Sequence, residues 1–446
     1  MRRLPRWLLF AAIVVVLAVG FALTFAVRTA RQSFPVVEGR LTLPGLSAPV
    51  EVVREAYGVP QVYADNAEDL FEAQGFVHAQ DRFWEMDVRR HIAAGRLSEL
   101  FGPSQVDTDA YIRTLGWRAV AEQELSLLSS STRRYLDAYA AGVNAYLRSR
   151  SPAELSLEYS VLGIQGLDYT PEDWTAADSV AWLKVMAWDL GSNLSQESEL
   201  AEMTAEVGAA RAAQLFPPYP LPGFDPIVQR GEVVDGVFDP TASGPRTGQA
   251  PRGRRPAGGQ GAEGALRSIA ELTAALPRSV TGAAAGVGTA DAGSNSFAVA
   301  GARTASGSAI LANDPHLATS IPSIFTQGGL HCRTLTTACP FDVTGFSLAG
   351  VPGVLIGKNS LVAWGLTTAY ADTMDLYLEQ LQEDTVRRGQ AYEPLQVRTE
   401  QIRVRGEDQP RSIRVRTSRH GPLLSDVDTE LQQVGSATAA GGEPYA

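Results

Sequence analysis

The sequence is poor in cysteine, which excludes a zinc site built on sulfur. Only Cys332 and Cys339 occur among its 446 residues, and neither a CxxC nor a mixed His/Cys pattern is present. Structural zinc sites need about four such ligands at short spacings. In an oxidising compartment the two cysteines would form a small disulfide loop, and two free buried thiols are the alternative.

An excess of positive charge is also missing. Lys and Arg number 38 against 49 Asp and Glu, so the formal net charge is -11. Nucleic-acid binding requires a basic surface, and we therefore exclude a nucleic-acid partner. The remaining composition, 45% hydrophobic and 20% charged, is ordinary for a globular protein, with length for one large domain or about three average ones.

One long uncharged apolar run is present, near the N-terminus. After a basic start it extends from Trp7 to Val27, about 31 Å as a helix, which is enough to cross a bilayer. A secretory signal is the alternative, but no clean small-residue cleavage site precedes Arg28. We expect residues 1–31 to be a cytoplasmic stub with a transmembrane anchor, or a signal. Both place residues 32–446 outside the cytoplasm, at the cell membrane or secreted.

Hydrophobic periodicity divides the rest of the chain. Residues 48–66 alternate around Gly58 and predict two strands joined by a turn. Residues 32–239 are otherwise mainly helical, because apolar residues recur at helical spacing over 67–100, 127–146 and 171–193.

Residues 240–293 are dominated by Gly, Pro, Ala and Arg and cannot bury enough apolar surface to fold, so they are a linker, spacer or propeptide. After them, short apolar segments predict strands of a buried sheet at 295–300, 309–312, 351–356 and 361–365.

Gly293, Ser294 and Asn295 lie where the spacer meets this sheet. A Ser that becomes the first residue of a new chain carries a hydroxyl nucleophile and a free α-amine, whose pKa of roughly 7.7 to 8.0 suits a general base. Gly293 has no side chain, so the Ser294 hydroxyl could approach its carbonyl during self-cleavage. The alternative is that the triplet is an ordinary strand entry.

Four stretches of sequence resemble one family. They are "GVPQVYADNAEDLFEAQGFVHAQDRFWEMDVRRHIAAGRLSELFG", "GSNSFAVAG", "ILANDPHLATSIPS" and "GFSLAGVPGVLIGKNSLVAWGLTTAYADTMDLYLE". Together they resemble the penicillin acylase family of N-terminal nucleophile hydrolases over most of residues 40–380. The resemblance implies an α+β fold, with a four-layer αββα core of two facing sheets between helical layers and a mainly helical α-chain domain. It also implies a precursor that cuts itself before Ser294, leaving an α chain (32–239), an excised spacer (240–293) and a β chain whose N-terminal part is 294–446.

The resemblance further implies roles for individual residues. Ser294 would be the nucleophile with its own amine as base, Asn295 follows it as in the family, and the Thr368 backbone N–H would form part of the oxyanion hole. His316 would bond near the α-amine or the substrate amide. The alternative for His316, which follows Asp-Pro, is that it caps a turn.

A structural calcium ion is implied in the same way. Its ligands would be Asp372, Asp375, the Met374 carbonyl and Glu197, with Glu199 close enough to replace Glu197. Without the family match, such acidic residues would more often be solvated surface.

The acyl pocket would be lined by Met186, Leu190 and Phe297, each of which could equally be core. Family members continue well past the position that corresponds to Ala446, and the oxyanion Asn, an Arg and further calcium ligands lie in that later region. We therefore expect a truncated coding sequence or fragment.

The expected function is an autoprocessed amide hydrolase that cleaves a penicillin, another side-chain amide or an N-acyl homoserine lactone. An uncut, inactive membrane-anchored scaffold is one alternative. A conventional serine hydrolase is another, because residues 345–350 loosely match Gly-x-Ser-x-Gly, but that motif requires a following helix.

Overall fold

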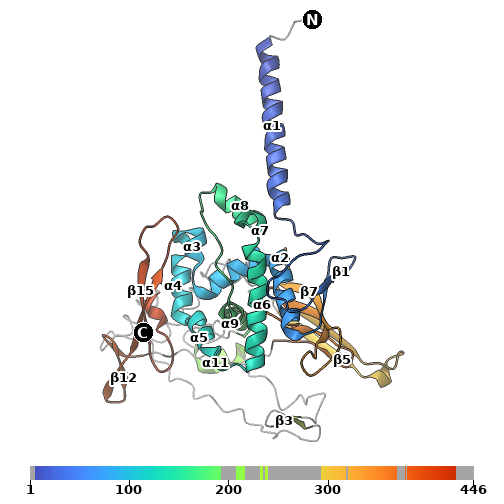
Figure 1. The fold of residues 1–446 in the computed structure, drawn as a ribbon. Helices are drawn as coiled ribbons and strands as arrows, with labels where there is room; N and C mark the ends of the chain where they lie inside the picture. Colours follow the sequence, from blue (N-terminus) through green and yellow to red (C-terminus); the bar gives the residue numbers. More distant parts are fainter. Residues whose placement is uncertain are drawn as a thin grey trace. The chain divides into compact units, whose positions relative to one another are not determined.

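The structure is a computed structural model that describes residues 6–191, 207–215, 232–234, 237–239, 293–317, 320–368, 377 and 379–427. These residues fall into two compact units. The first holds the described residues up to 191, those from 293 to 368, and 396–427 (Figure 1). The second holds the remaining described residues, and each unit is treated by itself.

Most of residues 67–191 in the first unit are helical, which confirms the helices predicted from the hydrophobic spacing in this part of the chain. Asn66 caps the central helix α2, because its side chain accepts the Asp69 N–H at 2.8 Å, and Gly95 ends that helix with a φ of 61°. The helices are α1 (Arg6–Gln32), α2 (Ala67–Ala94), α3 (Leu97–Phe101), α4 (Val106–Leu115), α5 (Trp117–Glu124), α6 (Ser130–Arg148), α7 (Pro152–Leu155), α8 (Leu157–Ile164) and α9 (Ala176–Gly191).

The main sheet of this unit has six strands in the order β1-β2-β7-β8-β9-β10. They are β1 (Glu51–Arg54), β2 (Pro60–Ala64), β7 (Phe325–Cys332), β8 (Asp342–Leu348), β9 (Ile356–Lys358) and β10 (Ala363–Trp364). The predicted pair around Gly58 is confirmed as the antiparallel β1 and β2, while β2 pairs with β7 in parallel. Cys332, at the end of β7, forms the predicted disulfide with Cys339.

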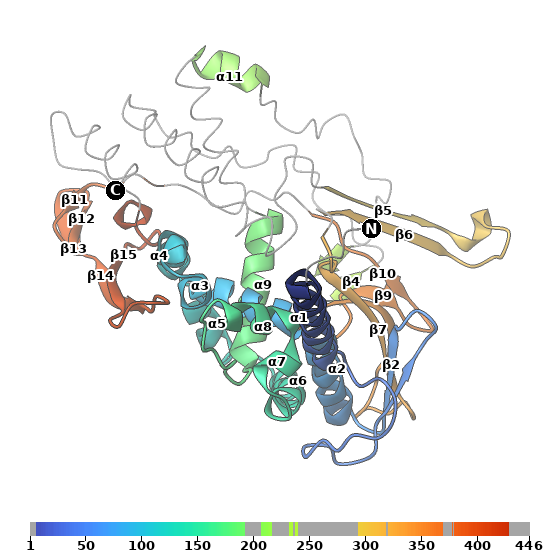
Figure 2. The same cartoon turned by 90° about the horizontal axis from the view of Figure 1, so that it is seen from above.

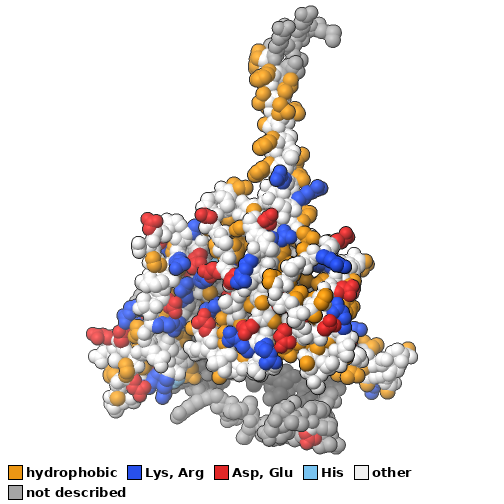
Figure 3. All heavy atoms as spheres, in the orientation of Figure 1, with side chains coloured by type: hydrophobic (Ala, Val, Ile, Leu, Met, Phe, Trp, Pro, Cys, Tyr) orange, Lys and Arg blue, Asp and Glu red, His pale blue; other side chains and the backbone are white. Residues whose placement is uncertain are grey.

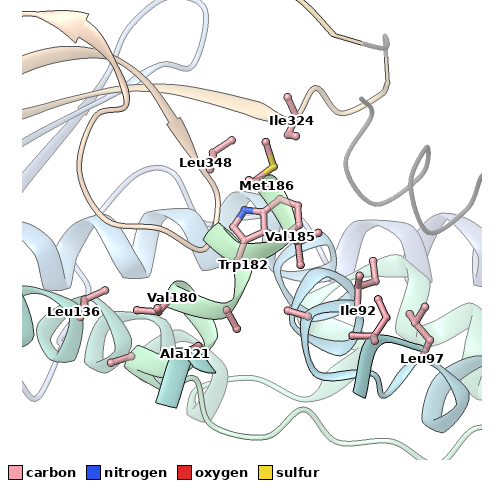
Figure 4. Packing of buried hydrophobic residues seen from close by; sticks show 14 residues of the cluster. Ile92, Leu97, Ala121, Leu136, Val180, Trp182, Val185, Met186, Ile324 and Leu348 are labelled. Carbon is pink, nitrogen blue, oxygen red and sulfur yellow. The ribbon is translucent and has the colours of Figure 1, made fainter. Parts of the chain in front are cut away.

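Helix α2 packs against β2 and β7, so the core lies between the helices and one face of the sheet (Figure 2). Figure 4 shows one part of this core. Trp182 and Met186 of α9 lie beside Ile324, which precedes β7, and Leu348, the last residue of β8. Helix α9 is thereby fixed to β7 and β8 of the main sheet.

Smaller sheets complete the described structure. In the first unit, β5 (Gly293–Val299) pairs with β6 (Ile310–His316), and β14 (Gln396–Ile402) pairs with β15 (Arg411–Thr417), all antiparallel. The second unit contains α11 (Ala209–Leu215), the pair β3 (Glu232–Val234) and β4 (Val237–Asp239), and the three strands β11 (Leu381–Gln382), β12 (Thr385–Arg388) and β13 (Ala391–Pro394).

Two details of the strand prediction were wrong. Residues 351–355 form turns rather than a strand, because Gly350 and Gly353 have positive φ angles of 104° and 93° that a strand does not accommodate. The β5–β6 hairpin is also not buried, since Phe297 on β5 is 63% exposed. The described residues therefore form a mixed helix and sheet fold, while the four-layer arrangement stays a prediction.

Candidate functional site

The β5–β6 ladder brings together residues that the sequence placed in the site. Ser294 is the second residue of β5 and is half-buried. In the ladder Ser294 lies opposite Pro315, and Gly293 lies opposite His316. Antiparallel partners have Cα atoms roughly 4.5–5.5 Å apart. His316 therefore shares a face of the hairpin with Gly293, while the side chain of the next residue, Ser294, points to the other face. The predicted role of His316 stays a prediction.

The His316 ring is oriented by a carboxylate on its own strand. Its Nε2 lies 2.8 Å from Oδ2 of Asp314, and the two side chains are 47% and 75% exposed. Residues two apart in a strand share a face, which explains why they meet. The pair lies at the surface of the hairpin, where water and a small solute can reach it. His316 is the last residue of β6, and both the predicted catalytic role and the turn-capping alternative stay predictions.

A residue that the sequence reasoning missed connects this hairpin to the predicted oxyanion segment. The Asn313 side chain, on β6, donates to the backbone carbonyl oxygens of Asn295 and Leu366, both at 3.0 Å. Its Oδ1 accepts the Leu366 N–H at 3.0 Å. Leu366 belongs to the segment 365–368, which follows β10, and this segment includes Thr368. Figure 2 shows β6 running next to β9 and β10, where the contact is made.

Thr368 is half-buried and is the last described residue of this segment before residue 377. The segment is fixed at its start as well, because Trp364 pairs with Gly357 in β9 and its Nε1 donates to the Leu355 carbonyl at 3.0 Å. The backbone leading to Thr368 is thus held by the main sheet on one side and by Asn313 of the β5–β6 hairpin on the other.

The three predicted acyl-pocket residues lie in two different environments. Met186 is 5% exposed and belongs to the core cluster shown in Figure 4, against which Leu190 also packs. Phe297 lies on the exposed strand β5. The structure brings Met186 and Leu190 together, and their role in binding a substrate stays a prediction.

The predicted calcium ligands Glu197, Asp372, Met374 and Asp375, and the competing Glu199, lie outside the described residues. Within the described ranges no group of three or more His, Cys, Asp or Glu side chains is placed to hold a metal ion. The calcium site therefore stays a prediction.

Ser347, the serine of the alternative Gly-x-Ser-x-Gly match, does not have the geometry of an exposed nucleophile. It lies within β8, is 4% exposed, and its hydroxyl donates to the Gly353 carbonyl. A turn rather than a helix follows β8. The strand-to-helix elbow of a conventional serine hydrolase is thus not formed at Ser347.

Comparison with known proteins gives a consistent set of matches. A family model described as penicillin amidase matches residues 49–444. A penicillin acylase 2 proenzyme of Pseudomonas sp. (strain SE83) is 35% identical over 410 residues, which are 90% of this chain and 47% of that protein. The acyl-homoserine lactone acylase QuiP of Pseudomonas aeruginosa is 32% identical over 442 residues, which are 97% of this chain and 47% of that protein.

The chain thus spans about half the length of these relatives, 47% in both cases. Among solved structures, a thermostable penicillin G acylase from Alcaligenes faecalis is 32% identical, with a match that covers 38% of this chain and 89% of that chain at a TM-score of 0.33.

Proposed function

Because this chain belongs to the penicillin amidase family, we propose that it is a self-processed amide hydrolase whose nucleophile is Ser294. The observation that carries the proposal is the β5–β6 register. In it Gly293 pairs with His316 and Ser294 with Pro315, on the hairpin that Asn313 connects to the segment before Thr368. The family's four-layer core and its division into α and β chains are part of the same proposal.

Processing would begin with attack of the Ser294 hydroxyl oxygen on the Gly293 carbonyl carbon. The peptide C–N bond breaks as the ester C–O bond forms, and water then hydrolyses the ester to release a Gly293 carboxylate. Ser294 gains its free α-amine in this way. Until that step it has a hydroxyl but no base of its own.

Substrate hydrolysis would use the same hydroxyl. The α-amine takes the hydroxyl proton as the oxygen attacks the amide carbon, and the Thr368 N–H donates to the resulting oxyanion. Collapse of the tetrahedral intermediate breaks the amide C–N bond, and the departing amine receives the proton. Water then hydrolyses the acyl-enzyme to a carboxylic acid and restores Ser294.

For the substrate we propose a small molecule with an apolar acyl group on an amide nitrogen. The two relatives are named for penicillin and for acyl-homoserine lactones, which share such an amide. Met186, Leu190 and Phe297 are the proposed acyl-binding residues, and their apolar side chains suit an aromatic or aliphatic acyl group.

Ser294→Ala tests the nucleophile. The protein is expressed from its complete natural gene and examined by intact mass and N-terminal sequencing. We expect wild type to yield a new chain beginning Ser-Asn-Ser-Phe, and Ser294→Ala to stay uncut and without amidase activity. Ser296→Ala is the matched control, because Ser296 lies on the same strand and its hydroxyl bonds only to the Ala312 carbonyl among the described residues. A single uncut chain in wild type would reject the enzyme and favour an inactive scaffold.

We also propose that Glu197 or Glu199, with Asp372, Asp375 and the Met374 carbonyl, holds a structural calcium ion. Oxygen ligands of this kind suit a hard cation, which would link the α and β chains. Metal analysis of the purified protein tests this, and calcium below one equivalent in an active enzyme would reject it.

The apolar helix α1 is proposed to anchor the catalytic region at the outer face of the cell membrane. Support comes from its length and composition: the span Phe10–Gln32 contains an 18-residue window with a mean hydropathy of 2.7. A signal sequence has the same properties and is the alternative.

A further inference from the structure

Asn313 has the contacts of a backbone partner rather than those of a surface side chain. Its amide N–H groups donate to the carbonyls of Asn295 and Leu366, and its Oδ1 accepts from the Leu366 N–H, all at 3.0 Å. Both amide hydrogens and one oxygen lone pair are used. Toward Leu366 the side chain reproduces the paired N–H and C=O bonds that a neighbouring β-strand would supply.

Gly365 provides the space that this contact needs. A Cβ atom on Gly365 would lie 2.7 Å from Asn313 Cγ and 2.8 Å from its Oδ1 and Cβ. Carbon atoms are not found so close without a bond, so any side chain at 365 would displace Asn313 or the segment. Asn313 and Gly365, which are far apart in the sequence, therefore fit together because position 365 has no side chain.

The positions joined by Asn313 are next to the proposed catalytic groups. Asn295 directly follows Ser294, and Leu366 precedes Thr368 by two residues. Resting on the proposed function, we propose that Asn313 is a positioning residue that fixes the Thr368 N–H relative to the Ser294 hydroxyl. It contacts neither the substrate nor the reacting atoms in this role.

The physical reason is the narrow geometry of an oxyanion hole. Its donors must lie about 2.7–3.1 Å from the developing oxyanion, and removal of one donor typically lowers kcat by about 10²–10³-fold. A donor that is present but misplaced still stabilises the oxyanion in part, so kcat falls less than when the donor is removed. The hydrogen bonds of Asn313 are exposed and so add little to overall stability. Loss of the contact should therefore lower kcat clearly while it changes the melting temperature little.

Asn313→Asp and Asn313→Ala test the inference. Asp has nearly the same shape but would set a carboxylate oxygen against two carbonyl oxygens, and Ala removes the contact. Gly365→Ala tests the same contact from the other side. Asn359→Ala is the matched control, since the Asn359 side chain accepts the Leu361 and Val362 N–H groups at 2.8 Å in the turn between β9 and β10.

Hydrolysis is followed with nitroanilides of phenylacetic and hexanoic acid, and active enzyme is counted by titration with a serine-directed reagent. For both Asn313 variants and for Gly365→Ala, we expect kcat per active site to fall by roughly 10–100-fold. This is less than the fall caused by complete removal of one oxyanion-hole donor. KM should change less than threefold, and the control should resemble wild type. A kcat per active site within threefold of wild type in the variants, or an equal loss in the control, would overturn the inference.

Self-cleavage separates this inference from the proposed function. An uncut, inactive wild type defeats the proposed function itself. If wild type is cut but an Asn313 variant is not, the variant is compared with the equally uncut Ser294→Ala. Equal melting temperatures mean that the fold is intact and support positioning, whereas a lower melting temperature in the Asn313 variant shows a folding role and overturns it.

Discussion

At the scale of single residues, a buried hydrogen-bonded chain joins the helices to the sheet. The Tyr139 hydroxyl on α6 accepts the Gly350 N–H at 3.0 Å, so its own proton points to Nδ1 of His78 on α2, 2.8 Å away. Burial, with a smaller contribution from the charge of Arg82, lowers the pKa of His78 to about 3. His78 is therefore a neutral acceptor in the core, and its contacts are those of a structural residue.

This lowered pKa predicts a pH-dependent stability. The ordinary pKa of 6.5 applies to His78 when the chain is unfolded. Below that pH, His78 therefore binds a proton in the unfolded state but not in the folded state. Stability is then lost as pH falls from about 6.5 toward 3. For one such group, the loss between pH 7 and 5 is about 2 kcal/mol.

His78→Gln keeps an acceptor for Tyr139 but does not titrate. In urea unfolding at pH 7 and 5, we expect its loss of stability between the two pH values to be smaller than that of wild type by about that 2 kcal/mol. His420→Gln, at an exposed position, is the control and should follow wild type. Equal losses in wild type and His78→Gln would contradict the assignment.

At the scale of elements, helices α2 and α6 cross at a contact that only glycine allows. A Cβ on Gly142 of α6 would lie 1.8 Å from the Glu72 carbonyl oxygen, and one on Gly75 of α2 would lie 2.0 Å from that of Tyr139. Each glycine thus faces the backbone of the other helix. The crossing sets the position of α2, which packs against β2 and β7.

Gly142→Ala should therefore force the two helices apart and destabilise the protein by about 1–3 kcal/mol or more, the usual range for overpacking. Gly163→Ala in α8 is the control, because nothing lies within 4 Å of a Cβ there; it should leave the stability unchanged or raise it by up to about 1 kcal/mol. Thermal unfolding of both variants is the measurement. Similar melting temperatures for the two variants would show that α2 and α6 can move apart without a loss of stability, which would contradict the prediction.

The elements also show what the sequence can predict. Local periodicity was sufficient to predict the helices α2, α6 and α9 and the β1–β2 pair. The spacing of apolar residues within each element shows which of its faces is buried. It was not sufficient for residues 351–355, where apolar side chains occupy turns. Asn313 was also missed, since its partner Leu366 is 53 residues away and no local pattern encodes that contact. The family resemblance supplied Ser294 and Thr368 as candidates but not the Asn313 side chain, which connects the segments next to them.

At the scale of the whole molecule, α1 is the element that the rest of the described structure does not cover. None of its membrane-length window is buried, and Val16 and Phe21 are 69% and 75% exposed. Figure 3 shows hydrophobic side chains along the visible face of this helix. Near its C-terminal end, Gln32 donates to the Ser160 hydroxyl on α8 at 3.4 Å, so the helix ends against the folded body. Exposed apolar area costs roughly 25 cal/mol per Å² in water, and a bilayer removes this cost.

We therefore expect the protein to sediment with membranes and to resist extraction with alkaline carbonate, since a helix of this hydropathy inserts stably. Deletion of residues 1–31 should release the rest of the protein into the soluble fraction with the proposed self-cleavage unchanged. Among the described helices and strands, only the short α7 and α8 make more than isolated contacts with α1. Fractionation and N-terminal sequencing of the longer chain are the measurements. A soluble wild-type protein that begins near residue 32 would identify α1 as a cleaved signal. The exported location would hold in that case, but the anchor would be rejected.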